Sequence, residues 1–141
     1  MMKRVFSILM CLLLCFSFSA TANAQTVQTS IVQPYYEKAS NAMSELSVSD
    51  TKATCISTTK GKSDVTKIVA EQTLQKQGFL WIWSTYDGAE WVKTTYTNIL
   101  AMSNTKTGLS SGKYRLKTVF TLTDKNGKTE TITVYSDEKS V

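Results

Sequence analysis

The chain has 141 residues, with 16 basic and 11 acidic side chains and no histidine. The basic residues form no cluster, so a nucleic-acid surface is not expected. Without histidine, and with only three cysteines, a zinc or copper site is not expected either, and we predict no metal and no cofactor.

Residues 1–24 have the pattern of a secretory signal peptide. Lys3 and Arg4 precede an apolar stretch from Val5 to Phe18, and the small-x-small sequence Ala22-Asn23-Ala24 follows. The apolar stretch is shorter than the roughly 20 residues that a spanning helix needs. We therefore predict cleavage after Ala24 and a secreted, extracellular protein with no membrane span after cleavage.

The chain that remains after Ala24 would form one domain and act as a monomer. It keeps 14 basic and 11 acidic side chains, a mild excess that allows weak attraction to anionic cell-wall polymers. Cys11 and Cys15 leave with the leader, so Cys55 has no partner in the chain. We predict a buried, inert thiol, because free cysteine is among the most buried residue types. The alternative is an intermolecular disulfide or a reactive thiol.

The remaining sequence alternates apolar and polar residues in short runs separated by Gly, Asn and Asp, which is typical of an all-β sandwich. We predict an extended lead-in at 25–40, the sandwich at 41–136 and a polar tail at 137–141. The seven predicted strands are 41–48, 52–59, 65–75, 79–86, 90–102, 113–123 and 128–136, with a turn at Asp87-Gly88. The side chains predicted to face the core include Leu46, Cys55, Ile68, Leu74, Val92, Tyr96, Leu100, Phe120 and Ile132.

Seven strands in about a hundred residues match an immunoglobulin-like or fibronectin-III-like sandwich. Tyr114 follows Gly112 at the start of the sixth strand, where these domains place a tyrosine corner whose hydroxyl bonds to the preceding backbone. Cys55 and Leu116 stand where antibody domains place their two bridging cysteines. The corner is therefore predicted without a disulfide. A lipocalin-like barrel is the main alternative, although such barrels usually need more strands.

The last hairpin has two possible registers. A three-residue loop ending at Gly127 keeps Phe120 opposite Ile132, with both inward, whereas a two-residue loop turns Ile132 to the outer face. We predict the three-residue loop, with Asp124 opposite Lys128 and a positive φ at Gly127.

The sequence GFLWIW, residues 78–83, is the most unusual stretch. If it continues a strand, Phe79, Trp81 and Trp83 share one face, and the two aliphatic residues between them share the face that suits the core. The aromatic face either packs inward or forms an exposed binding platform, which Trp91 would join across the Asp87-Gly88 turn. Both alternatives remain open, and we predict that at least one of Trp81 and Trp83 is substantially exposed.

Motifs that suggest catalysis lack their required context. GLSSG, residues 108–112, matches the G-x-S-x-G elbow, but a loop precedes it, a strand follows it, and the chain has no histidine base. We predict a non-enzymatic module that binds a protein or a glycan at or outside the cell envelope. The alternatives are a small secreted hydrolase that uses a carboxylate pair, and an inhibitor or antibacterial effector.

Three stretches, ATCIS (53–57), TKIVAEQTLQK (66–76) and GKYRLKTVFTLTDKNGKTETITVYS (112–136), resemble an uncharacterised family of small secreted Firmicutes proteins, clostridial ones especially. The resemblance spans roughly residues 31–136 and implies a secreted β-sandwich. It implies no catalytic residue. Residues 77–104 depart from the family pattern because they are richer in aromatic side chains.

Overall fold

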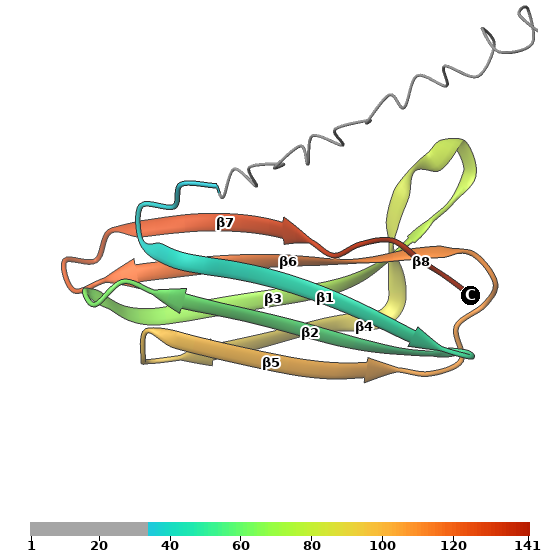
Figure 1. Ribbon diagram of the computed structural model, residues 1–141, viewed down its shortest axis with the longest axis horizontal. Helices are drawn as coiled ribbons and strands as arrows, with labels where there is room; N and C mark the ends of the chain where they lie inside the picture. Colours follow the sequence, from blue (N-terminus) through green and yellow to red (C-terminus); the bar gives the residue numbers. More distant parts are fainter. Residues whose placement is uncertain (1–33) are drawn as a thin grey trace, which may run out of the picture. The chain divides into compact units, whose positions relative to one another are not determined.

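Two antiparallel sheets face one another in residues 34–141, the part of the chain that the computed structural model describes (Figure 1). Sheet A has the order β1-β2-β5 and consists of β1 (Ala39–Ser49), β2 (Lys52–Gly61) and β5 (Ile99–Lys106). Sheet B has the order β4-β3-β6-β7 and consists of β3 (Val65–Gln77), β4 (Trp83–Thr95), β6 (Lys113–Asp124) and β7 (Thr129–Tyr135), with β8 (Lys139–Ser140) also paired to β6. The predicted signal peptide and residues 25–33 of the lead-in lie outside the described residues.

The all-β prediction is confirmed, with one strand more than the seven expected. Residues 34–141 contain eight strands, because Lys139 and Ser140 of the predicted polar tail pair with Tyr114 and Lys113. Val141 then packs partly against the core, so the C-terminal residues belong to the sandwich. Among the residues that the structure describes, no helix is long and hydrophobic enough to cross a membrane.

The middle of the chain differs from the prediction. Residues 79–82 do not begin a strand but form a tight turn, η1 (Phe79–Trp81), and β4 starts only at Trp83. Asp87-Gly88 is not a turn between strands, because β4 runs through it to Thr95 and the chain reverses at residues 96–98. The predicted bounds 79–86 and 90–102 are therefore wrong, although most of these residues do lie in β4 or β5.

A bulge in β4 explains why the strand passes through Asp87-Gly88. Thr73 pairs with Glu90, and Gln75 pairs with Thr85, so residues 86–89 oppose a single residue of β3. Gly88 adopts a φ of 61° in this bulge, a conformation that glycine tolerates well.

The shift of the turn also reverses the faces of the residues that precede it. Val92 and Tyr96 were predicted to face the core, but they are 69 % and 78 % exposed. Ala89 is fully buried, and Trp91 packs partly against both core clusters. The prediction counted the alternation of side chains from a turn that the structure does not have. A shift of one residue exchanges the two faces of a strand.

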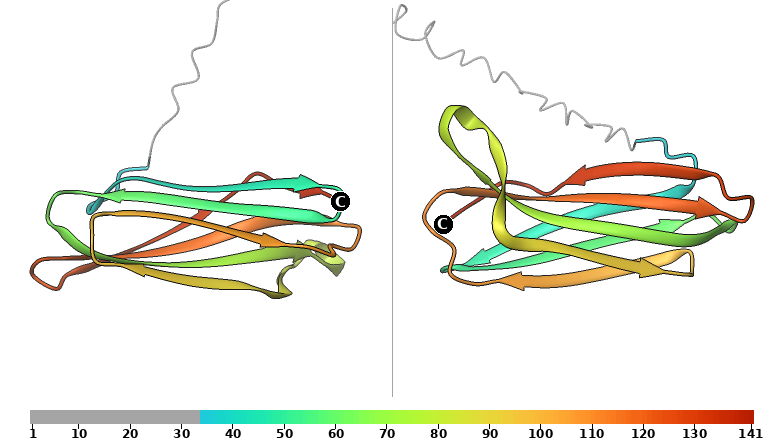
Figure 2. Two further views of the ribbon diagram at one scale, coloured as in Figure 1. Left: turned by 90° about the horizontal axis from the view of Figure 1, so that it is seen from below. Right: turned by 180° about the vertical axis from the view of Figure 1, so that it is seen from behind.

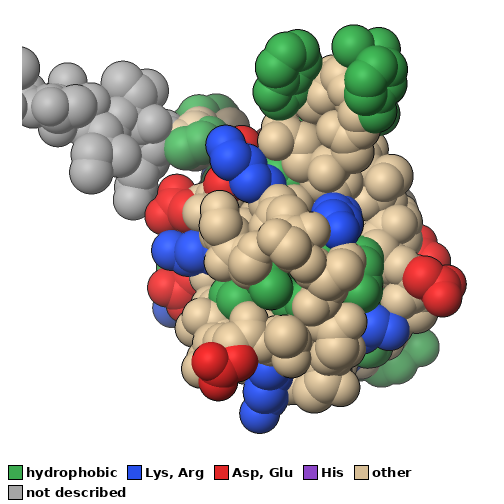
Figure 3. Space-filling view, turned by 90° about the vertical axis from the view of Figure 1, so that its right-hand side faces the viewer, with side chains coloured by type: hydrophobic (Ala, Val, Ile, Leu, Met, Phe, Trp, Pro, Cys, Tyr) green, Lys and Arg blue, Asp and Glu red, His purple; other side chains and the backbone are tan. Residues whose placement is uncertain are grey.

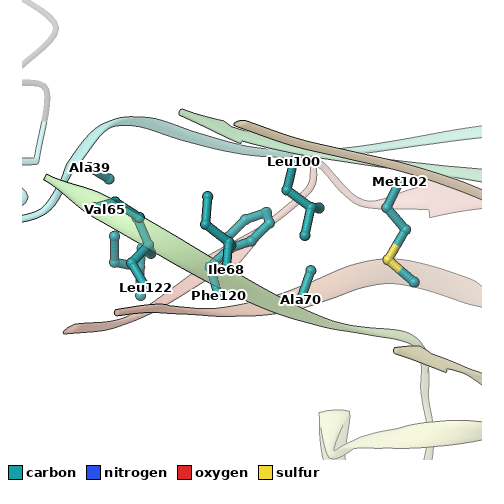
Figure 4. Packing of buried hydrophobic residues seen from close by; sticks show 9 residues of the cluster. Ala39, Val65, Ile68, Ala70, Leu100, Met102, Phe120 and Leu122 are labelled. Carbon is teal, nitrogen blue, oxygen red and sulfur yellow. The ribbon is translucent and has the colours of Figure 1, made fainter. Parts of the chain in front are cut away.

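The core forms where the inward side chains of both sheets meet. In the first cluster, Leu100 and Met102 of β5 point toward Ile68, Ala70 and Phe120 of sheet B (Figure 4). The second cluster includes Leu46, Cys55, Leu74, Leu109, Tyr114 and Leu116. Cys55 is buried and free, as predicted, and lies in the same cluster as Leu116.

The last hairpin has the predicted three-residue loop. Phe120 pairs with Ile132, the amide of Asp124 donates to the carbonyl of Lys128 at 2.9 Å, and Gly127 has a φ of 79°. This loop keeps the apolar side chains of both β6 and β7 on the inward face of the sheet.

The tyrosine corner also forms. Tyr114 is fully buried, and its hydroxyl donates to the backbone carbonyl of Ser110 at 2.7 Å. The ring packs edge-on against Tyr86, with 5.4 Å between ring centroids.

A chain of polar side chains crosses the interior between the two apolar clusters. Thr118 Oγ1 shares hydrogen bonds with Ser44 Oγ at 3.0 Å and with Ser57 Oγ at 2.7 Å. Gln72 Nε2 donates to Ser57 Oγ at 2.7 Å, and Asn104 Nδ2 donates to Gln72 Oε1 at 2.9 Å. These five residues, which we call the polar chain, come from five strands and join the two sheets.

A buried ion pair closes the end of the sandwich where β1 begins. Lys38 Nζ donates to Asp124 Oδ2 at 2.6 Å, and the two side chains are 6 % and 4 % exposed. The other oxygen of Asp124 accepts from the amides of Asn126 and Lys128. A carboxylate oxygen of Glu130 accepts a hydrogen bond from the Lys38 amide at 2.6 Å. Lys38 therefore binds both Asp124 and Glu130, which belong to the last hairpin, and helps to hold that hairpin in place.

We expect Thr118→Val to lower the free energy of unfolding by about 1–3 kcal/mol, because it leaves the buried Ser44 hydroxyl without its partner. Urea denaturation measures the loss. The matched control is Thr121→Val on the outward face of the same strand, which should change stability by less than about 0.5 kcal/mol. Equal losses in the two variants would contradict a specific role for the polar chain.

We expect Asp124→Asn to weaken the acid sensitivity of folding. The hydrogen bond from Lys38 lowers the pKa of Asp124, so the carboxylate's contribution is present above the ordinary aspartate pKa and is lost as the pH falls through the lowered value. The same bond raises the pKa of Lys38, whose contribution is lost only as the pH rises through that raised value. Urea denaturation of the parent and of the variant, from about pH 7 to about pH 2, measures the free energy of unfolding of each. If the two free energies fall in parallel as the pH is lowered, the acid sensitivity does not come from Asp124.

Candidate functional site

The hairpin between β3 and β4 carries a run of exposed apolar residues at its end. Phe79, Leu80, Trp81 and Ile82 are 86 %, 63 %, 77 % and 63 % exposed. The hairpin projects from one end of the sandwich, yellow-green in Figures 1 and 2. In the end view, two groups of apolar side chains extend beyond the surrounding surface (Figure 3). We call residues 79–82 the apolar tip.

The backbone of the apolar tip is an unusual turn for its sequence. The Ile82 amide donates to the Phe79 carbonyl at 3.3 Å, and the Gly78 amide donates to the Ile82 carbonyl at 2.8 Å. Leu80 and Trp81 between them have φ values of 56° and 59°. Two consecutive positive φ angles define a type I′ turn, which strongly prefers Asn-Gly. The left-handed conformation costs a residue with a side chain about 1–2 kcal/mol.

An aromatic and cationic stack supports the base of the hairpin on the outer face of sheet B. The Arg115 guanidinium carbon lies 4.4 Å from the ring centroid of Trp83 and 4.3 Å from that of Tyr135. Arg115 Nε also donates to Gln75 Oε1 on β3 at 2.9 Å. We call Trp83, Arg115 and Tyr135 the basal stack. It fixes the strands that lead into and out of the apolar tip.

Lys76 supports the hairpin from the opposite face, because neighbouring residues of a strand point to opposite sides. Its Nζ donates to Ser110 Oγ at 2.7 Å and lies 5.6 Å from the centre of the Tyr114 ring. A side chain at position 112 would place Cβ 2.6 Å from Lys76 Cε. Gly112, predicted as a turn residue before the tyrosine corner, therefore also makes room for Lys76.

The structure separates the four residues that the sequence predicted as a binding surface. Phe79 and Trp81 lie in the apolar tip, and the exposure of Trp81 confirms that one of the two tryptophans is open to solvent. Trp83 is half-buried in the basal stack, and Trp91 packs against both core clusters. The predicted common face of Phe79, Trp81 and Trp83 does not form, because these residues do not share a strand. The two aliphatic residues, expected to suit the core, are exposed as well.

A separate pocket of about 330 Å³ lies where β1 and β2 approach the segment from Tyr135 to Lys139. Glu45 and Asp137 both line it, together with Lys139 and Tyr135. The hydrolase alternative requires more than a shared pocket, because its two carboxyl groups must stand roughly 5–10 Å apart on either side of the scissile bond. Nowhere in residues 34–141 do three potential metal-ligating His, Cys, Asp or Glu side chains come together.

Comparison with protein-family models, with curated proteins and with solved structures finds no match to this chain. The interpretation of the site therefore depends on its geometry. Sequence reasoning missed the roles of Lys76 and Arg115, since nothing in their local sequence indicates which aromatic rings they meet. It also missed the turn at Leu80-Trp81, which lacks the usual glycine or asparagine.

We expect acrylamide to quench Trp81 far more than Trp91. Trp81→Phe should remove the most accessible part of the fluorescence and change the free energy of unfolding by less than about 0.5 kcal/mol, because the side chain is 77 % exposed. Trp91→Phe should remove fluorescence that acrylamide does not quench and should lower the free energy of unfolding, since that ring contacts both core clusters. Protection of both Trp81 and Trp83, with a stability loss for each replacement, would mean that the tip is part of a core.

Proposed function

We propose that this chain is a non-enzymatic binding module that contacts its partner through the apolar tip. The observation that supports this most directly is the type I′ turn formed by Leu80 and Trp81. Both residues adopt a strained backbone conformation and expose most of their apolar surface, so folding gains little from either. Strained residues that persist on a surface are characteristic of binding sites, and large exposed apolar patches on monomers mark interaction sites.

The two supports at the base of the hairpin favour the same function. Arg115 stacks between Trp83 and Tyr135, while Lys76 bonds to the loop before β6. A contact element held in its bound conformation loses less entropy on binding. The module would therefore present the tip as a preformed projection.

We further propose that the sandwich is of the fibronectin-III type. The order β1-β2-β5 opposite β4-β3-β6-β7 and the Tyr114 corner support this assignment, and β8 would be an addition to it. We also propose secretion after cleavage at Ala24, and membership of the Firmicutes family that residues 53–57, 66–76 and 112–136 resemble. An extracellular location suits a module whose single remaining cysteine is buried and free.

The test replaces the tip by the residues that its turn prefers. We expect the double variant Leu80→Asn/Trp81→Gly to raise the free energy of unfolding by about 1–2 kcal/mol, because it relieves the left-handed strain. The same variant, in the chain from Gln25, should lose binding to the envelope fraction of a Firmicutes bacterium, measured by co-sedimentation.

The matched control is Tyr96→Ser, which removes an aromatic side chain of similar exposure (78 %) from the β4–β5 turn. This variant should bind as the parent does. If the double variant still binds the envelope, or if the parent does not bind it, the apolar tip is not the contact element.

A further inference from the structure

We infer that the partner of the apolar tip is a lipid bilayer surface, into which residues 79–82 insert while the basal stack lies at the level of the headgroups. This inference depends on the proposed function and names the partner of the same element. Three properties of the hairpin support it: the chemistry of the tip, the chemistry of its base, and the distance between them.

The tip presents apolar side chains without any polar side chain among them. All four of its residues are at least 63 % exposed, so apolar surface faces several directions around a convex projection. Interfaces with proteins usually combine apolar contacts with about one hydrogen bond per 100–200 Å², and sugar sites require polar groups that fix orientation. A bilayer requires neither, because it deforms around an apolar projection.

The backbone of the tip also suits an apolar environment. The Gly78 and Ile82 amides donate to carbonyls within the loop, at 2.8 Å and 3.3 Å. Polar backbone groups that enter lipid are costly unless they are paired internally. The turn thus reduces the number of free backbone groups that insertion would desolvate.

The base of the hairpin has the composition of a membrane interface. Trp83 and Tyr135 enclose the guanidinium of Arg115, at 4.4 Å and 4.3 Å. Tryptophan and tyrosine are enriched at the boundary between lipid and water, and arginine places its charge at the headgroups while its stem remains in apolar surroundings. Along the hairpin, the apolar tip would therefore match the hydrocarbon region of the bilayer, and the basal stack would match the interface.

The spacing between the two levels agrees with shallow insertion. Arg115 pairs with Gln75 on β3, three residues before the loop begins at Gly78, which corresponds to roughly 10 Å along a strand. Peripheral elements bury their apolar surface about 5–10 Å deep. The tip can therefore enter the acyl boundary while the basal stack remains among the headgroups.

The experiment uses protein-free vesicles and the chain from Gln25, which lacks the apolar leader. One set contains phosphatidylcholine alone, and the other adds about 30 % phosphatidylglycerol, whose negative charge attracts the basal arginine. We expect sedimentation with both sets, more strongly with the anionic one. Vesicles with brominated acyl chains should quench the fluorescence of Trp81, which is the part of the emission that the Trp81→Phe variant lacks.

Matched variants separate insertion from general adhesion. Leu80→Asn/Trp81→Gly and Phe79→Ser should each weaken the partition coefficient at least tenfold, whereas Tyr96→Ser should leave it within twofold of the parent. Equal binding of all four proteins, or binding without quenching by brominated lipid, would overturn insertion of the tip.

The outcomes also distinguish this inference from the function on which it rests. If vesicles bind no protein while the envelope fraction still binds through the tip, and protease treatment of that fraction abolishes binding, the partner is a protein and the lipid inference is wrong. If neither vesicles nor the envelope fraction binds through the tip, the proposed function is wrong as well.

Discussion

The interior hydrogen bonds that link Ser44, Thr118, Ser57, Gln72 and Asn104 constrain how the two sheets can face each other. Apolar residues tolerate small sliding movements, but a hydroxyl or amide that loses its partner in the interior costs far more. No buried side-chain nitrogen or oxygen in the described part of the chain lacks a hydrogen-bond partner. One register therefore satisfies both the apolar clusters and the polar residues between them, and that register also determines where the β3–β4 hairpin leaves the sandwich.

The hairpin itself combines a well-supported base with an end that contributes little to folding. Arg115 and Lys76 connect its strands to neighbouring elements on both faces of sheet B, whereas the apolar tip closes on itself. Strain in the left-handed turn is tolerated because the base holds the two strands together. The arrangement matches a general pattern in which function is carried by loops positioned by a rigid scaffold.

Sequence patterns predicted the parts of the fold whose side chains alternate without interruption. β6 is the clearest case, since Tyr114, Leu116, Phe120 and Leu122 are all fully buried, and the Phe120–Ile132 pairing followed from the requirement that both residues face inward. The region of the candidate site was not predictable in the same way. Alternation assumes a continuous strand, and it fails both at the Leu80-Trp81 turn and at the bulge around Gly88. The two cationic supports depend on contacts between distant residues, which no local pattern contains.

Cys55 makes opening of the sandwich observable without introducing a new reactive residue into the protein. Burial raises the pKa of its thiol to about 12, so at neutral pH the folded protein offers almost no thiolate to a reagent in solution. The unfolded chain exposes a thiol of ordinary acidity at the same position. Reaction at this one sulfur therefore proceeds through transient separation of the sheets, and its rate reports how often the second core cluster opens.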